Sequence, residues 1–351
     1  MDSSPKGIDV DGIIHEYEID VGSTSPIRVR GTDTGTKIFK VDRQDLIEEL
    51  YIVDTEQGGR IACHPHIVGE ELKALAFDAA LEAAKAMEQL TDLSKMDCIV
   101  FENVLRAAPG YELQAAFKEL HDGRRFRDVW IRPRYERPSY RGHDEEPSTR
   151  LDIVYEDFEA LPCNMEMTVL KPDTEATGKT GQKSIERIVK KCKNAGSRIE
   201  KIILYGFISV PGLKRISETA QRHDIELAAF SIGNITDLAH NGYDMTVYGV
   251  DESYWKANGE IRKLGSIADS STLERYLPEF VPGSDQPGDW SNRQTSIYTT
   301  KEKKEPGAIE QHLQNSIELI KSLKRISGYD EWQQEIAEKE LRLLSDTLRE
   351  H

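Results

Sequence analysis

The chain has 351 residues, of which 38% are hydrophobic and 31% charged, a composition typical of a globular protein of one large domain plus additions or of two domains. A formal net charge of -16 argues against a general nucleic-acid binder, because phosphate backbones need a basic surface. No apolar run approaches the length of a membrane span, so we expect no membrane partner.

The cysteines carry no pattern of a disulfide framework or a zinc site. Cys63, Cys98, Cys163 and Cys192 are scattered without C-x-x-C spacing, which predicts reduced thiols. The first five residues contain no apolar signal core, so we expect a cytoplasmic location. The run 63–66, Cys-His-Pro-His, has no matching second pair of metal ligands, and we interpret it as a turn before a helix.

The first 60 residues are predicted as a β-rich extension. Alternating segments at 27–30 and 37–41 flank a Gly-rich turn and predict a hairpin. After it, Asp42 is expected to cap a short helix that ends at Val53. An Ala-rich helix is expected over 70–90, with small residues that allow close packing.

A first candidate anion site follows the predicted strand 98–101. The next residues form a loop of small side chains that carries Arg106, and an amphipathic helix is expected over 111–120. A strand, a small-residue loop with an arginine and a helix N-terminus together suit an anion, although a surface arginine on a connection is the alternative.

A long hairpin is predicted between strands at 128–132 and 151–155. The connection is dense in Arg, Pro and acidic residues, which indicates either a lid or a solvated charged loop. The arginines that would supply positive charge to a ligand there are Arg132, Arg134, Arg137 and Arg141.

The central segment reads as a buried strand at 167–170, a polar loop and then a helix. The loop offers small residues, threonine hydroxyls and consecutive backbone amides at a helix start. Its residues are Asp173, Thr174, Glu175, Ala176, Thr177, Gly178, Lys179 and Thr180. This composition predicts a phosphate site, and a strand-to-helix turn with a threonine cap is the structural alternative.

A P-loop is one of two phosphate-binding designs that compete for this loop. Gly178-Lys179-Thr180 matches the end of G-x-x-x-x-G-K-[ST], but Asp173 stands where the first glycine belongs. The later apolar run 201–207 ends without a carboxylate that would hold Mg²⁺. The second design has an apolar strand, an acidic pair, three residues and Thr-Gly-x-Thr, with Asp173 as the second acid.

Helices and strands alternate after this loop. Helices are expected at 182–192 and 213–222, and strands at 201–205, 225–232 and 247–250. The alternation predicts an α/β fold with a mostly parallel sheet flanked by helices, whose site lies beyond the carboxyl ends of the strands. Two amphipathic runs in 306–351, separated at Gly328, predict a C-terminal helical hairpin for packing or oligomerisation.

Three of these segments together resemble type I phosphoribosyltransferases of the uracil phosphoribosyltransferase kind, over roughly residues 95–295. The segment 167–180 is similar to their loop for phosphoribosyl diphosphate (PRPP), with Pro172 in place of the first acid. The segment 104–110 is similar to their Ile-Leu-Arg-Ala-Gly run, with Ala108 for the glycine. The segment 280–290 is similar to their base-binding hood, and Arg293 stands for the arginine that follows it.

The resemblance implies transfer of a 5-phosphoribosyl group from PRPP, with Mg²⁺, to a nitrogen of a uracil-like nucleobase or related acceptor, with release of diphosphate, as in nucleotide salvage. Arg106 and Arg132 would meet the diphosphate, Asp173 the ribose hydroxyls and the rest of 174–180 the 5-phosphate. Asp285 and Asp289 would bind Mg²⁺ or orient the base, and with Arg106 they are the implied catalytic residues. Backbone groups of Val281, Gly283 and Ser284 would read the base.

Other functions stay open at this point. A non-catalytic homologue that senses PRPP or nucleotides is favoured by Pro172, and a P-loop nucleotide-binding protein is less favoured. We predict a β-rich extension at 1–60, the phosphoribosyltransferase-like domain at 61–300 and the helical hairpin at 301–351, in a homodimer or higher homo-oligomer.

Overall fold

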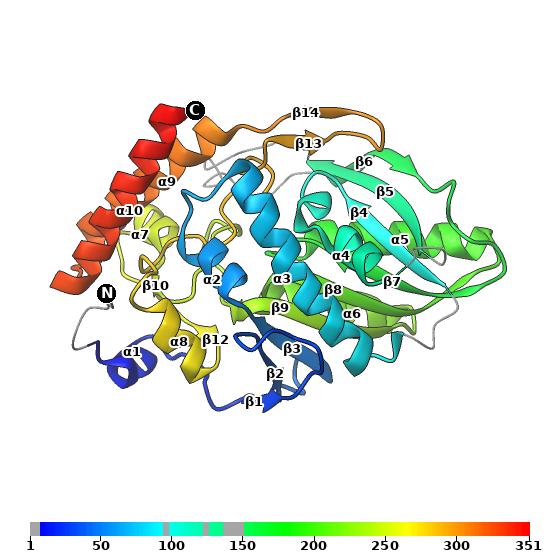
Figure 1. The fold of residues 1–351 in the computed structure, drawn as a ribbon, viewed down its shortest axis with the longest axis horizontal. Helices are drawn as coiled ribbons and strands as arrows, with labels where there is room; N and C mark the ends of the chain where they lie inside the picture. The colour runs from blue at the N-terminus through cyan, green and yellow to red at the C-terminus, as the bar shows by residue number, and fades with distance from the viewer. Residues whose placement is uncertain (1–7, 94–97, 122–125, 136–150) are drawn as a thin grey trace.

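The computed structural model describes residues 8–93, 98–121, 126–135 and 151–351. It contains a ten-stranded sheet in the order β1-β2-β3-β9-β8-β7-β4-β5-β6, with β12 paired to β9 (Figure 1). The strands are β1 (Thr24–Ile27), β2 (Lys37–Val41), β3 (Glu49–Asp54), β4 (Ile99–Val104), β5 (Phe126–Tyr135), β6 (Leu151–Asp157), β7 (Glu166–Pro172), β8 (Arg198–Ser209), β9 (Glu226–Thr236) and β12 (Ser266–Ile267).

The middle of the sheet is parallel, as the sequence predicts. Neighbouring strands from β3 through β9, β8, β7 and β4 to β5 all run in the same direction. β2, β6 and β12 run in the opposite direction, and β1 pairs antiparallel with β2 at the edge of the sheet. The carboxyl ends of β4 and β7 are therefore adjacent. The α/β fold class with helices flanking a mostly parallel sheet is confirmed.

Helices cover both faces because the central strands are apolar on both sides. On one face, α2 (Glu56–Cys63), α3 (Gly69–Leu90) and α4 (Leu113–Leu120) share a core with the rings of Phe101 and Phe230. On the other, α5 (Lys179–Asn194) and α6 (Val210–Arg222) pack with side chains that include Val169 and Ile202. Figure 1 shows the sheet between these two sets of helices.

Two of the predicted elements are wrong. The helix expected from Asp42 to Val53 is absent, and residues 49–54 form β3, whose Leu50 and Ile52 are fully buried between β2 and β9. A short apolar run buried on both sides has no alternation that separates strand from helix. The strand expected at 247–250 does not join the central sheet, since β10 (Gly249–Val250) pairs with β11 (Lys263–Leu264).

The residues predicted as a separate N-terminal extension contribute β1, β2 and β3 to one side of the central sheet. The expected first hairpin is confirmed, with β1 placed three residues earlier than the predicted segment. The remaining described elements are α1 (Val10–Glu16), η2 (Ala108–Tyr111), α7 (Glu252–Asn258), α8 (Ser270–Tyr276), β13 (Ser296–Tyr298) and β14 (Lys304–Pro306).

The predicted C-terminal helical hairpin is present as α9 (Ile309–Ile326) and α10 (Glu331–Glu350). Gly328 has φ +58° at the break between the helices, a conformation that favours glycine. The apolar stripes of both helices form a core of their own together with Val68 and Val281. No helix in the described part of the chain is long and apolar enough to cross a membrane.

We predict that Leu323→Ala destabilises the protein by about 2–5 kcal/mol, because the side chain is fully buried between the hairpin and the segment at Gly283. Urea unfolding followed by circular dichroism measures the change. Leu343→Ala is the control, since Leu343 is half-buried on α10 and lies outside this core. Equal losses of unfolding free energy for the two variants would show that the hairpin does not depend on the apolar core between its helices.

Candidate functional site

The loop after β7 is held against β8 by backbone hydrogen bonds. The amide of Asp173 donates to the carbonyl of Tyr205 over 2.9 Å, and the amide of Glu175 donates to that of Phe207 over 2.9 Å. Gly206 has φ +145°, and a Cβ there would lie 2.1 Å from the carbonyl oxygen of Asp173. The close approach of these two backbones therefore requires glycine at 206, and it fixes the path of the chain out of β7.

The second half of the loop leads directly into the N-terminus of α5. Gly178 precedes the helix with φ +69°, and no described side chain caps the helix. Arg215 Nε donates to the carbonyl of Thr177 over 2.8 Å, and Ser209 Oγ donates to the carbonyl of Ala176. The turn is thus held by its carbonyls, which leaves the amides of the first helical turn for an anion.

The hydroxyl and lysine side chains of this turn are partly exposed. Thr177, Lys179 and Thr180 are all half-buried. The amide of Lys179 lies 3.4 Å from Thr177 Oγ1, at the long limit of a hydrogen bond. Hydroxyls, an ammonium group and helix amides are therefore together at the predicted phosphate site.

The acidic side chains of the loop point into the protein interior instead. Lys171 Nζ, fully buried in β7, lies 3.1 Å from Asp173 Oδ2 and 2.9 Å from Glu175 Oε1. Glu102 on β4 is also fully buried nearby, and its Oε2 accepts from Ser184 Oγ over 3.4 Å. One buried ammonium group thus lies among three buried carboxyl groups and is paired with two of them, and Asp173 is only 5% exposed.

One positive charge cannot keep all of these carboxylates ionised. Burial raises the pKa of Glu175 and of Glu102 to about 7 in each case, against the opposing effect of Lys171. Burial also raises the pKa of Asp173. Burial by itself disfavours the charge on Lys171, but Glu175, Asp173 and Glu102 together raise its pKa, so the lysine stays charged. The carboxyl groups of the cluster therefore share protons near neutral pH.

Two arginines lie where the parallel pairing of β4 with β5 ends. Arg106 follows β4 across a cis peptide bond with Leu105, and Arg132 lies on β5, next to the parallel pair Val104 and Ile131. Burial, and then the positive charge of Arg106, lower the pKa of Arg132, whose Nη1 donates to the carbonyl of Thr299 over 3.3 Å. Arg106 pairs with no carboxylate in the described part of the chain. Of the other predicted arginines, Arg134 is exposed and Arg137 and Arg141 lie outside the described residues.

The loops after β4 and β7 meet at the ring of Tyr111. The hydroxyl of Tyr111, on η2, shares a hydrogen bond with Thr174 Oγ1. The ring stacks on Trp290 with a centroid separation of 4.2 Å. This contact joins the loop after β4 to the start of the loop after β7, and no sequence motif pointed to Tyr111. The convergence of Arg106 with the Thr177 turn stays a prediction.

The segment resembling the base-binding hood packs under the C-terminal hairpin. Val281 is fully buried in the hairpin core, and Tyr329 donates its hydroxyl to the carbonyl of Pro282. The amide of Gly283 donates to the carbonyl of Tyr248 over 2.8 Å, and that of Ser284 to the carbonyl of Val281 over 3.0 Å. The backbone amides expected to read a base are thus engaged within the protein.

The two aspartates expected to hold Mg²⁺ are engaged with nearby backbone. Asp285 Oδ1 accepts from the amide of Met245 over 2.9 Å, and Asp289 Oδ1 from that of Asn292 over 3.1 Å. The cavity that they line together with His312 has a volume of about 10 Å³, room for about one water molecule. Carboxylate oxygens suit Mg²⁺, but this space does not fit a hydrated ion with a diphosphate.

Arg293, expected to take the place of the family's hood arginine, is fully buried. Its guanidinium donates to backbone carbonyls only, among them those of Ile67 at 2.9 Å and His64 at 3.0 Å, and to that of Pro287 at 3.1 Å. Burial lowers its pKa to about 10. Arg293 therefore ties the hood segment to the connection between α2 and α3.

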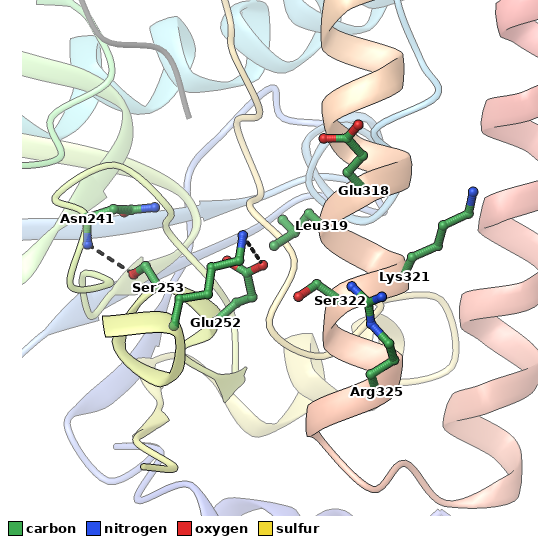
Figure 2. Close-up of a pocket in the computed structure, with 9 residues that line it drawn as sticks. Asn241, Glu252, Ser253, Glu318, Leu319, Lys321, Ser322 and Arg325 are labelled. Atoms are coloured by element: carbon green, nitrogen blue, oxygen red, sulfur yellow. Dashed lines mark hydrogen bonds and ion pairs between the residues drawn. The ribbon is translucent and has the colours of Figure 1, made fainter. Parts of the chain in front are cut away.

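A larger cavity, of about 390 Å³, lies between α7 and α9 (Figure 2). Its lining is mostly polar and carries both charges: Asn241, Glu252, Ser253, Lys256, Glu318, Leu319, Lys321, Ser322 and Arg325. The 237–246 loop connects it to the predicted phosphate site, because a Cβ on Gly242 would lie 3.2 Å from Thr177 Cγ2. No sequence motif pointed to this cavity.

Comparisons with solved structures find phosphoribosyltransferases. Orotate phosphoribosyltransferase from Francisella tularensis matches at 13% identity and TM-score 0.28, over 60% of this chain and 75% of that one. L. donovani hypoxanthine-guanine phosphoribosyltransferase matches at 12% identity and TM-score 0.28, over 57% of this chain and 94% of that one. Hypoxanthine phosphoribosyltransferase from Trypanosoma cruzi, complexed with the product IMP, matches at 14% identity and TM-score 0.28, over 59% and 92%.

These solved structures belong to the class of enzymes that the sequence motifs resemble. No protein-family model and no curated protein matches the sequence. A likeness at this TM-score carries no inference about activity, so the function rests on the residues themselves.

We predict that Lys171→Met destabilises the protein by about 3–5 kcal/mol at pH 8, because it leaves buried carboxylates without their cation. The loss is smaller at pH 5. Glu102 and Glu175 have folded pKa values of about 7, above their unfolded values, so their contribution to stability is present at low pH and lost as the pH rises through 7.

Urea unfolding at pH 5 and pH 8 measures this difference. Lys190→Met is the control, since Lys190 is exposed on α5. A loss for Lys171→Met that is equal at both pH values would contradict the shared-proton arrangement.

Proposed function

We propose that the chain is a phosphoribosyltransferase that binds PRPP at the carboxyl edge of β4, β5 and β7 and transfers the phosphoribosyl group to a nitrogenous acceptor. The observation that carries the proposal is the α5 N-terminus. It has no side-chain cap, and it follows a Thr-Gly-Lys-Thr turn that is held in place by Arg215 and Ser209. A phosphate monoester is the anion that such a site favours.

The diphosphate end of PRPP is assigned to Arg106 and Arg132. Arg106 follows β4, which is adjacent to β7, and Arg132 lies on β5, which pairs with β4. An anion bound there would be stabilised by the positive charge of both side chains. Departure of diphosphate leaves positive charge on the ribose, so the arginines stabilise the leaving group and orient it. Mg²⁺ would accompany the diphosphate, and no step of the reaction is assigned to Asp285 or Asp289.

Asp173 has a different part here from the one that the resemblance implies. Its carboxyl group is buried and paired with Lys171, so it reaches a ribose hydroxyl only if the pair opens. We assign Asp173 to positioning the loop, with Thr174, Glu175 and Ala176. Thr177, Gly178, Lys179 and Thr180 form the phosphate contact itself.

A second function is favoured by two specific observations. The hood amides are engaged internally, and Pro172 with Lys171 removes the carboxylates that would hold the ribose. Both favour a protein that binds PRPP or a nucleotide without turnover. The 237–246 loop contacts Thr177 on one side and lines the large cavity on the other, so it would respond to ligand binding.

We predict that Arg106→Gln weakens PRPP binding about 10- to 100-fold, because a charge-assisted contact contributes about 1.5–3 kcal/mol. Thr177→Val is expected to cost about tenfold, since it removes one neutral hydrogen bond. Calorimetry with the full chain, PRPP and Mg²⁺ measures both values. Arg198→Gln is the control, because Arg198 is exposed at the opposite edge of the sheet, at the start of β8.

Release of diphosphate from PRPP with a panel of pyrimidine and purine bases then separates the two functions. Turnover with any base supports the transferase. Binding that depends on Arg106 but gives no turnover supports the sensor. A wild-type chain that binds no PRPP, with or without Mg²⁺, overturns the transferase, and one that binds neither PRPP nor a nucleotide overturns both.

A further inference from the structure

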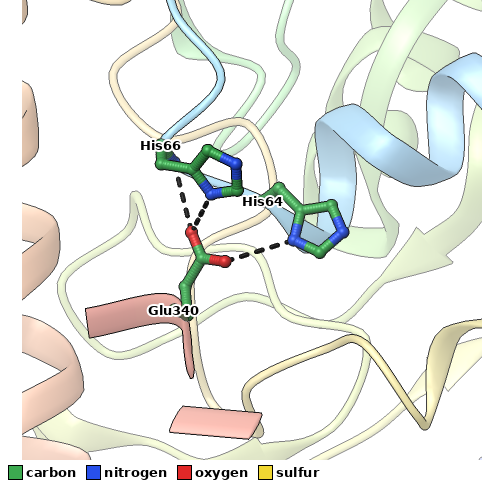
Figure 3. Close-up of side chains that lie close together, drawn as sticks. All are labelled: His64, His66 and Glu340. Carbon is green, nitrogen blue, oxygen red and sulfur yellow. Dashed lines mark hydrogen bonds and ion pairs between the residues drawn. The ribbon is translucent and has the colours of Figure 1, made fainter. Parts of the chain in front are cut away.

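Two histidines and a glutamate converge where the C-terminal hairpin meets the core. His64 and His66 lie on the connection between α2 and α3, and Glu340 lies on α10, 274 residues after His66. His64 Nδ1 is 3.2 Å from Glu340 Oε2, and His66 Nδ1 is 2.7 Å from Glu340 Oε1. Figure 3 shows both rings turned toward the one carboxylate.

We propose that His64, His66 and Glu340 form a binding site for a divalent transition-metal ion, with Zn²⁺ preferred, that fastens α10 to the core. One atom from each residue lies within 4.8 Å of the others. Ligands of tetrahedral Zn²⁺ lie about 2.0–2.2 Å from the ion, and hence about 3.3 Å from one another. The observed separations of 2.7 and 3.2 Å require shifts of a few tenths of an ångström for these two pairs.

The type of ligand decides which ion the site takes. Two imidazole nitrogens and one carboxylate are a common zinc set, and they favour Zn²⁺ or Co²⁺ over Mg²⁺, which prefers oxygen ligands. Three protein ligands leave a fourth position. The side chains of His64 and His66 are 13% and 20% exposed, so water has access to that position.

A supporting carboxylate orients His64 as metal ligands are oriented in known sites. His64 Nε2 lies 2.9 Å from Glu279 Oε2, which holds a proton on Nε2 and orients the ring so that Nδ1 faces Glu340. Without metal, Nδ1 also donates to Glu340 Oε2, and an incoming metal ion would displace that proton. Two further contacts hold the backbone of the connection between α2 and α3. His312 Nε2 lies 2.8 Å from the carbonyl of Pro65, and Arg293 donates to the carbonyl of His64. The ligands are thus placed before any ion arrives.

The buried carboxylate needs a cation in either case. Glu340 is 2% exposed, and a carboxylate at that depth is costly without positive charge beside it. Hydrogen-bonded ion pairs with the two histidine rings supply that charge without metal. The metal-free ion pair is therefore the competing arrangement, and the experiment separates the two.

The test uses the full chain, stripped of metal with a chelator and dialysed. We expect it to bind one equivalent of Zn²⁺ by calorimetry and elemental analysis, and to give the visible absorption of four-coordinate Co²⁺. Glu340→Gln and His66→Asn are expected to weaken Zn²⁺ binding by at least about 100-fold, and Glu279→Gln, which acts through His64, by about 10- to 100-fold. Zn²⁺ should also raise the melting temperature of the wild-type chain.

Glu338→Gln is the matched control, because Glu338 is on the same helix and pairs only with Lys324 among the described residues, with a side chain that is 61% exposed. It should bind Zn²⁺ like the wild type. If Glu340→Gln does not fold, His66→Asn, at the more exposed ligand, gives the answer. A wild-type chain without Zn²⁺ or Co²⁺ binding overturns the proposal, and so do ligand variants that bind Zn²⁺ as tightly as the wild type. No PRPP or base is present, so the result is independent of the proposed function.

Discussion

The ammonium group of Lys171 is the interaction on which the candidate site depends. It is placed at the end of the strand β7, where the chain must turn into the phosphate loop, and it holds Asp173 and Glu175 inside the protein. A loop whose acidic side chains pointed outward would repel a phosphate beside α5. By drawing two carboxyl groups into the interior, the lysine leaves the outer surface of the turn to hydroxyls, amides and Lys179, which is the electrostatic condition for binding an anion.

The same constraint separates two tasks that one loop is implied to perform in the resembled enzymes. Carboxylates there are implied to hold the ribose while the following residues hold its phosphate. Here residues 177–180 keep the Thr-Gly-x-Thr pattern, whereas the Asp173 carboxylate pairs with the buried Lys171. The C-terminal hairpin has a comparable effect on the hood, because the Val281 side chain and the Pro282 carbonyl serve the packing of α9 and α10. The loop and the hood segment thus depart from the resembled pattern at residues that serve the packing of this protein.

The sequence predicts the strands and helices of the central sheet better than the side-chain contacts between distant segments. Buried strands alternate with amphipathic helices from 98 onward, so the parallel order and the loops at its carboxyl edge follow from periodicity. The helix expected at 42–53 is wrong because a doubly buried strand has no alternation. In the sequence, Lys171 stands out only because it precedes Pro172, which departs from the resembled motif. No local pattern shows that its ammonium group pairs with Asp173 and Glu175 in the interior. The His64 and His66 pair lacked a partner in the sequence because Glu340 lies at the other end of the chain.

A net charge of -16 does not oppose the binding of a highly charged anion at this edge. At physiological ionic strength the Debye length is about 8 Å, so exposed carboxylates farther away than this are largely screened. What the ligand meets is the local field of Arg106, Arg132 and the α5 N-terminus, with the nearest acids neutralised by Lys171. The acidic remainder of the surface disfavours extended polyphosphates such as nucleic acids, which contact far more of it. This charge distribution therefore supports the proposal of a small phosphorylated ligand.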